Sequence, residues 1–145
     1  MRLSTGLRSF LVSSGSLKGA LDGCVIRLYS GTIPTSADDS KPAGADLLCT
    51  VSVDNTGGGI TFEAGTGGTL LKSPAEVWTG DVAANGEATW FRIVTPADAD
   101  DSSTTAVRLQ GSVASAGADM QITDPNLVTG EPQRIDYMSI AVPAT

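Results

Sequence analysis

The sequence predicts an all-β fold, an antiparallel β-sandwich of jelly-roll or immunoglobulin-like type with about eight or nine short strands. Two observations predict it. Short runs in which apolar and polar residues alternate recur along the chain, and clusters of Gly, Pro, Asn, Asp and Ser separate them. A closed barrel is the main alternative. We expect one sandwich domain over residues 24–145, preceded by a short helical arm at residues 1–23.

The arm has helical spacing. Ser4 or Thr5 can cap a first helix, a second helical turn follows over residues 17–21, and Gly23 ends it. Two interpretations are equally open: a helix that plugs one end of the sandwich, or an arm that packs on a neighbouring subunit. For the second interpretation, the candidate contact residues are Leu3, Leu7, Arg8, Phe10, Leu11 and Leu17.

Four strands are expected between the arm and residue 75. The first covers Cys24 to Ser30 and the second covers Asp46 to Val53. Two shorter strands follow at residues 60–63 and 69–72, each next to a glycine-rich turn. Alternation within the second strand predicts that its inward-facing residues are Leu47, Cys49, Val51 and Val53.

Residues 75–94 contain two apolar runs joined by the pair Asn85-Gly86. This pair favours a type I′ turn, so the segment is expected to form a β-hairpin with Gly80 opposite Phe91. One side of the hairpin would face the core with Trp78, Val82, Phe91 and Ile93. The other side, which we call the mixed face, would carry Val77, Thr79, Asp81, Trp90, Arg92 and Val94, with Asp81 and Arg92 close enough to pair.

Three more strands are expected after the hairpin. A loop at residues 96–103 leads into a strand at 105–113, and a short strand follows at 118–123. The last strand, at 133–142, has apolar residues on both faces. That pattern suits a central strand or a strand at a subunit contact.

Composition limits the function. The 145 residues carry sixteen acidic and nine basic side chains, a net charge of −7, and the basic residues are scattered singly. A nucleic-acid partner or an anionic membrane surface is therefore not expected, whereas solubility or docking on a basic surface would suit this charge. No run of about 18 apolar residues predicts a spanning helix.

Motifs for catalysis, cofactors or metals are not found in the sequence. Histidine is absent, which removes the commonest general base and zinc ligand, and the serines and lysines form no recognisable nucleophile motif. We therefore assign no catalytic, cofactor-binding or metal-binding residue and expect a protein that is not an enzyme. Cys49 is expected to be a buried thiol, and a disulfide with Cys24 stays open.

Two acidic features of the sequence are candidate sites. Asp98, Asp100 and Asp101 lie close together, but their spacing does not fit an EF-hand, and we expect a solvated loop rather than a calcium site. Glu76 beside Trp78 resembles an acid next to a sugar platform. We favour the structural interpretation, in which Trp78 faces the core.

Trp90 and Arg92, on the mixed face, are candidate interface residues. Tryptophan and arginine are enriched at the energetic centres of protein interfaces. The competing interpretation, which we favour slightly, is a second core beneath the N-terminal helices.

Several segments together resemble small proteins encoded in the structural modules of tailed bacteriophages. They are RLSTGLR, IRLYSGTIPTSAD, LLCTVSV, AEVWTGD with GEATWFRIV, STTAVRLQGSV, GAD and IDYMSIAVP. The resemblance covers most of the chain and contains no catalytic signature. It implies a virion component at the head, the neck or collar, or the tail, and it assigns no functional residue.

The first hypothesis is accordingly a non-enzymatic virion structural protein, made in the cytoplasm of the bacterial host. It would form a symmetric homo-oligomer and dock on other virion proteins, such as the major capsid protein or neck and tail proteins. Capsid decoration is favoured over a neck, collar or tail position. The rivals are a module that binds host-surface glycans and, last, a small hydrolase.

Overall fold

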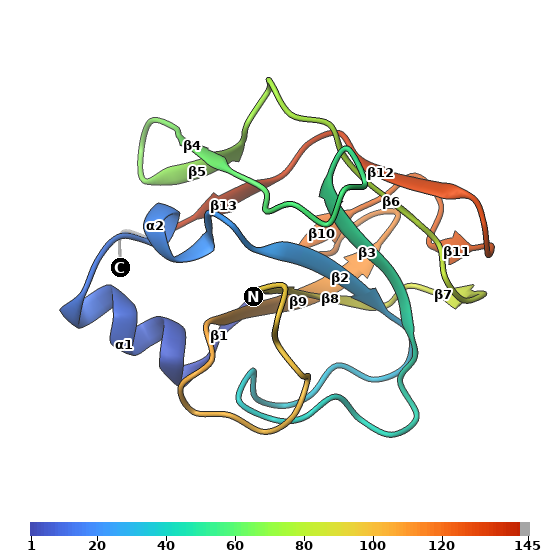
Figure 1. Cartoon of the computed structure of the whole chain (residues 1–145), viewed down its shortest axis with the longest axis horizontal. Helices are drawn as coiled ribbons and strands as arrows, with labels where there is room; N and C mark the ends of the chain where they lie inside the picture. The colour runs from blue at the N-terminus through green and yellow to red at the C-terminus, as the bar shows by residue number, and fades with distance from the viewer. Residues whose placement is uncertain (143–145) are drawn as a thin grey trace.

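The structure, a computed structural model that describes residues 1–142, is an all-β, sandwich-like fold with mostly antiparallel pairing (Figure 1). This confirms the predicted fold class. Two helices, α1 (Thr5–Ser13) and α2 (Leu17–Leu21), accompany the strands. The strands are β1 (Arg2–Leu3), β2 (Val25–Tyr29), β3 (Leu47–Val53), β4 (Phe62–Ala64), β5 (Thr69–Lys72), β6 (Trp78–Asp81), β7 (Gly86–Glu87), β8 (Trp90–Val94), β9 (Arg108–Ala114), β10 (Met120–Gln121), β11 (Asn126–Leu127), β12 (Pro132–Ile135) and β13 (Ser139–Ala141).

Eight strands form the main sheet. Seven follow the order β1-β9-β8-β2-β3-β6-β12, and β10 pairs with β9 in parallel beside this path. Strand β3 joins the two halves of the sheet, because residues 47–51 pair with β2 and residues 52–53 pair with β6. Two small sheets, β13-β5-β4 and β11-β7, lie beside it. Strand β12 ends the order, so one of its edges has no strand partner among residues 1–142.

The main core collects inward side chains from both halves of the sheet and from both helices. Phe62 and Trp78 meet edge to face, with ring centroids 5.1 Å apart. Cys49 and Val51 face this core as predicted, but Leu48 is buried where Leu47 was expected and Leu47 is 36% exposed. An irregularity in the β2–β3 register near Tyr29 shifts the facing at this end of β3.

The predicted hairpin at residues 75–94 is wrong. Strands β6 and β8 do not pair, because β2 and β3 lie between them in the sheet. Gly80 instead lets β3 approach: a Cβ at Gly80 would lie 2.0 Å from the carbonyl oxygen of Thr50. Asn85 accepts a hydrogen bond from the Thr129 N–H at 2.7 Å, and its φ is not positive, so no type I′ turn forms.

The predicted facing of the same segment is nevertheless correct for its apolar residues. The side chains expected in the core are all buried: Trp78, Val82, Phe91 and Ile93. The predicted pair of Asp81 and Arg92 is wrong, since Asp81 accepts a hydrogen bond from Asn55 and Arg92 lies on another part of the sheet.

The N-terminal segment packs on its own chain. Strand β1 pairs with β9, and Leu7 and Leu21 are fully buried in the main core, each at about 1.5–3 kcal/mol of burial free energy. Ser4 caps α1, as expected, by accepting from the Leu7 N–H at 3.1 Å. The structure therefore shows residues 1–23 packed on their own chain, as the first interpretation predicts, and a contact of this segment with a neighbouring subunit stays a prediction. The boundary between residues 23 and 24 stays a prediction.

The predicted last strand, at residues 133–142, is divided. Strand β12 is an edge strand and β13 joins a different sheet, so a single central strand is wrong. Residues 136–138 connect them and belong to no strand, and Tyr137 is 72% exposed. Both cysteines are buried and free, so Cys24 and Cys49 form no disulfide.

Candidate functional site: a buried arginine–aspartate network and a free strand edge

The outer face of the main sheet carries polar side chains where β2, β8 and β9 lie side by side. The register places Arg27 beside Arg92 and Arg92 beside Gln110. Two loops, residues 30–46 and 95–107, lie over this face, below β2 and β8 in Figure 1. We call the set that joins the loops to the sheet the loop–sheet network: Arg27, Tyr29, Trp90, Arg92, Asp98, Asp100, Arg108 and Gln110.

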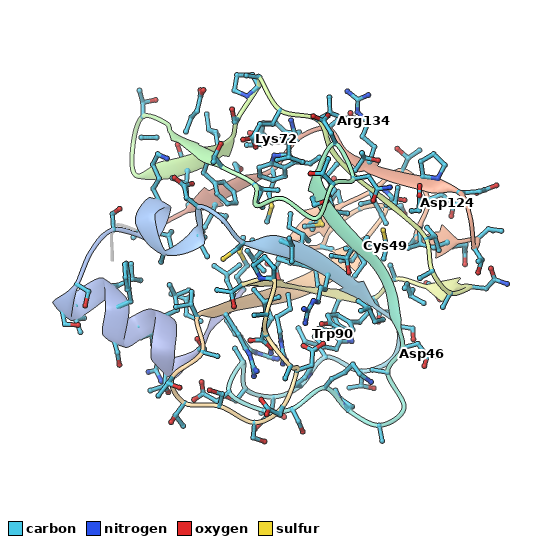
Figure 2. The ribbon with its side chains drawn as sticks, viewed as in Figure 1. Asp46, Cys49, Lys72, Trp90, Asp124 and Arg134 are labelled. Atoms are coloured by element: carbon cyan, nitrogen blue, oxygen red, sulfur yellow. The ribbon has the colours of Figure 1, made fainter. Side chains whose placement is uncertain are left out.

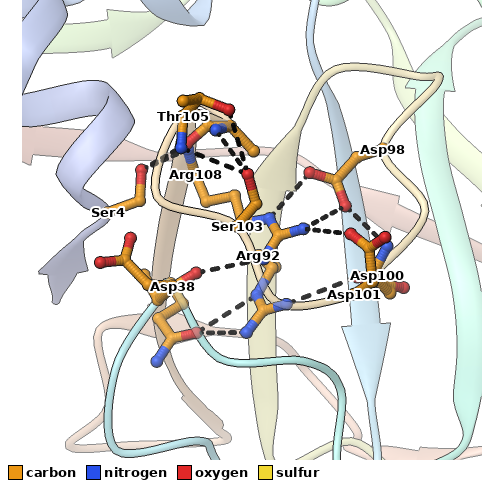
Figure 3. A network of polar contacts seen from close by, with 12 residues as sticks. Ser4, Asp38, Arg92, Asp98, Asp100, Asp101, Ser103, Thr105 and Arg108 are labelled. Atoms are coloured by element: carbon orange, nitrogen blue, oxygen red, sulfur yellow. Dashed lines mark hydrogen bonds and ion pairs between the residues drawn. The ribbon is translucent and has the colours of Figure 1, made fainter.

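Arg108 and Asp98 form the most enclosed ion pair of this network (Figure 3). Nε of Arg108 donates to Oδ2 of Asp98 at 2.8 Å, and Nη2 donates to Oδ1 at 3.0 Å. Their side chains are 1% and 2% exposed. Two such bonds to one carboxylate are strong and fix the guanidinium in place. Asp101, 77% exposed, adds a carboxylate 3.7 Å from Nη2.

Asp100 gathers three groups from the sheet. Its Oδ2 accepts from the Tyr29 hydroxyl at 2.7 Å and from Nη1 of Arg27 at 3.2 Å. Its Oδ1 lies 3.5 Å from Nη1 of Arg92, and neither of these two buried atoms has a hydrogen-bond partner in the described part of the chain. The other side of the Arg92 guanidinium is held well, because Nε and Nη2 donate to Oε1 of Gln110 at 3.2 and 2.9 Å.

Trp90 lies in a second, small core beneath the loop at residues 30–46. Its ring stacks on Tyr29 with centroids 4.1 Å apart, and its Nε1 donates to the carbonyl oxygen of Ser30 at 3.0 Å. The Arg92 guanidinium lies 5.3 Å from the ring centroid. A second core was the favoured interpretation, but the loop covers it and the N-terminal helices do not.

The electrostatics of the network suit anchoring. Burial raises the pKa of Asp98, but hydrogen bonds from Arg108 and from the Asp100 N–H outweigh it, so this pKa lies below its ordinary value. Burial and the hydrogen bond to Asp100 raise the pKa of Tyr29. Asp98 therefore stays ionised and Tyr29 stays neutral near neutral pH. The Asp98 carboxylate and the Tyr29 hydroxyl thus keep the protonation states that their hydrogen bonds to the sheet and the loop require.

The same region ties down the start of α1. The side chain of Asp38, in the first loop, accepts from the Thr5 N–H at 2.7 Å and from the Thr5 hydroxyl at 2.6 Å. The Ser4 hydroxyl donates to the Ala106 carbonyl in the second loop at 2.7 Å. Both loops, the sheet and the N-terminal helix thus form one connected body.

The candidate contact residues differ in exposure. Trp90, Arg92 and Leu7 are fully buried, so in this conformation their side chains are not available to a partner. Leu3, Leu11 and Leu17 are half-buried against the main core, and Phe10 is half-buried as well. Arg8 is exposed.

The solvated loop expected around Asp98, Asp100 and Asp101 is wrong for the first two residues, which are held by buried arginines. Among residues 1–142, no group of three or more acidic or cysteine side chains is placed to hold a metal ion. Trp78 is buried, as expected, and its Nε1 donates to Oε2 of Glu76 at 2.8 Å. Glu76 therefore anchors a core tryptophan.

A groove of about 470 Å³ lies between residues 118–123, around β10, and residues 134–139, which run from the end of β12 to the start of β13. Its buried apolar residues include Met120, Ile122 and Ile135. Arg134 and Tyr137 stand exposed at its border. The free edge of β12 runs along this groove.

Comparison of the chain with models of protein families, with curated proteins and with solved structures gave no match. In the described part of the chain, neither helix has the length and apolar character needed to cross a membrane.

Proposed function

We propose that this chain is a non-enzymatic structural protein of a bacteriophage virion, which self-associates symmetrically and decorates the capsid. The observation that carries the proposal is the loop–sheet network. It uses the buried arginines, the acidic loop and an aromatic pair to fasten two long loops to the sheet. Because both loops are fixed to the sheet, the chain would present a rigid outer surface to its neighbours. Subunits of a symmetric shell associate through such surfaces.

The distribution of charge supports docking on a basic surface. Arg27, Arg92 and Arg108 take part in internal ion pairs, so their charges are withdrawn from solvent. Acidic residues stay exposed around β6, β7 and β11, among them Asp81, Glu87 and Asp124. Complementary charge speeds docking and selects partners more than it raises affinity.

Neck, collar and tail positions are alternatives to the capsid. The glycan-binding alternative is weaker, because sugar sites use exposed aromatic rings and Tyr29, Trp78 and Trp90 are fully buried. Tyr137, beside the groove, is the exposed ring that such a site would use. A glycan array with wild-type protein and Tyr137→Ala tests that alternative.

The direct test is the protein content of particles. Virions banded from a lysate of cells that carry this gene are analysed by mass spectrometry, and immunogold labelling gives the position of the chain. We expect its peptides at a constant ratio to the major capsid protein. A chain that is abundant in the lysate but missing from the banded particles would overturn the proposal.

A further inference from the structure

The free edge of β12 has the hydrogen-bonding groups that a further strand needs. In β6, the N–H and C=O of Thr79 point to Ser52 of β3. The N–H and C=O of the residues on either side, Gly80 and Trp78, therefore point to β12, where they pair with Gln133 and Ile135. The intervening residue, Arg134, therefore directs its N–H and C=O away from β6. Its C=O accepts from the half-buried Gln133 side chain at 3.0 Å, which leaves the N–H directed at the edge. Figure 2 shows Arg134 at the border of the molecule beside β12.

Charges of opposite sign alternate along this edge. Arg134 and Asp136 are 61% and 78% exposed, and Nε of Arg134 lies 2.6 Å from Oδ1 of Asp136. Protected edge strands commonly carry charge or proline to prevent pairing. Here Pro132, which lacks an N–H, limits pairing at one end of β12, while the two opposite charges can attract a second edge of the same kind.

We propose that β12 is a self-association edge, which pairs antiparallel with β12 of a second copy across a two-fold axis at Ile135. The two main sheets would then become one continuous sheet. In this register Arg134 lies opposite Asp136 of the second copy, and Asp136 lies opposite Arg134 of the second copy. Two ion pairs therefore form across the axis, and cross-strand pairs of opposite charge stabilise a sheet.

The charges select this register over its neighbours. Alternate residues of a strand direct their N–H and C=O groups to the same edge. In a symmetric antiparallel pair, the two-fold axis therefore passes through a residue, and the neighbouring registers place it at Arg134 or at Asp136. Moving the two-fold axis to Arg134 or to Asp136 places that residue opposite itself, so that like charges face each other, which is destabilising. An axis at Ile135 gives opposite charges on both sides.

The occupant is a second copy because the edge is complementary to itself. A two-fold contact uses the same patch on both subunits, so each charge must find its opposite within that patch. Arg134 and Asp136 pair with each other within one chain, and across the axis each would exchange that partner for its opposite on the second copy. The inference deepens the self-association part of the proposed function and names the strand that would carry it.

The experiment exchanges the charges in the full-length protein. Sedimentation measures the mass of wild type, of Arg134→Glu, of Asp136→Arg and of the double variant. We expect each single substitution to raise the dissociation constant of the dimer at least about tenfold, because two pairs change from attraction to repulsion. The double variant exchanges the two charges and should dimerise like wild type.

Mixing makes the test independent of folding defects. Arg134→Glu leaves two acidic residues on the edge and Asp136→Arg leaves two basic ones, so the mixture should form heterodimers although each variant alone is monomeric. Glu63→Arg makes the same kind of charge change as Asp136→Arg, on the exposed face of β4, and should leave the dimer unchanged. A monomeric wild type, single variants that still dimerise, or a mixture that stays monomeric would overturn the proposal. Those results would leave the particle test to decide the virion role separately.

Discussion

Arg108 and Asp98 lie buried against each other, joined by hydrogen bonds of 2.8 and 3.0 Å that fasten the loop after β8 to strand β9. Asp98→Asn keeps the shape of the side chain and removes its charge. We expect the free energy of unfolding to fall by about 3–5 kcal/mol, because the buried charge of Arg108 then keeps only the exposed and more distant carboxylate of Asp101. Urea unfolding at neutral pH measures the loss.

Asp101→Asn is the matched control for this prediction. Asp101 lies on the same loop at 3.7 Å from Arg108, but its side chain is 77% exposed. Its removal should cost at most about 1 kcal/mol, as for other exposed pairs. Equal losses for the two variants would contradict the assignment of Asp98 as the anchor.

Stability should also fall in acid. The pKa of Asp98 lies below its ordinary value in the folded chain, whereas an unfolded aspartate has a pKa of about 3.9. Its stabilisation is therefore complete above about pH 5 and is lost as the pH falls through about 4 towards the folded pKa. The pKa values of Asp38, Glu76 and Asp119 are also lowered in the folded chain, so these carboxyls add to the loss of stability in acid.

Urea midpoints measured from about pH 7 down to about pH 3 check this dependence. Wild type should lose stability below about pH 4, and Asp98→Asn should show a shallower slope, because one of the contributing carboxyls is missing. A variant with the wild-type slope would contradict the role of Asp98.

Gly80 marks the place where β6 meets β3. A Cβ there would lie 2.0 Å from the Thr50 carbonyl oxygen, so Gly80→Ala should destabilise the fold by about 1–3 kcal/mol or more. Gly44→Ala is the control, because a Cβ at Gly44 meets nothing within 4 Å. Thermal unfolding compares the two. In the hairpin that the sequence predicted, Gly80 lies opposite Phe91 and not against the Thr50 carbonyl. Equal thermal midpoints for Gly80→Ala and Gly44→Ala would therefore contradict the close contact between β6 and β3.

The local pattern predicted facing better than pairing. Alternation placed Trp78 and Phe91 in the core correctly, since a side chain's direction follows from its own strand. The partner of a strand depends on distant residues. Here β2 and β3 lie between β6 and β8, and Asn85 bonds to Thr129 instead of forming a tight turn.

The cysteines give a chemical check on the core. Burial raises the pKa of Cys24 to about 11 and that of Cys49 to about 12, so few thiolates exist near neutral pH. We expect neither thiol to react with iodoacetamide in the folded protein and both to react after unfolding. Mass spectrometry counts the added groups. An unfolded, unreduced chain that takes up none would show a disulfide.

The loop–sheet network was the main feature that sequence reasoning missed. The sequence places Arg27, Arg92 and Arg108 on predicted strands, and the acidic loop at residues 96–103 follows the strand that contains Arg92. An arginine within an apolar strand needs a counter-charge if a loop covers it. What the sequence does not show is that coverage, because it depends on where residues 30–46 and 95–107 fold back.

Self-association is the claim that the proposed function and the β12 edge share. Light scattering on the wild-type chain over a dilution series measures it most directly, since the chain mass is 14.7 kDa. We predict twice this mass at high concentration, with dissociation to the single-chain mass on dilution. The single-chain mass at every concentration would contradict the account.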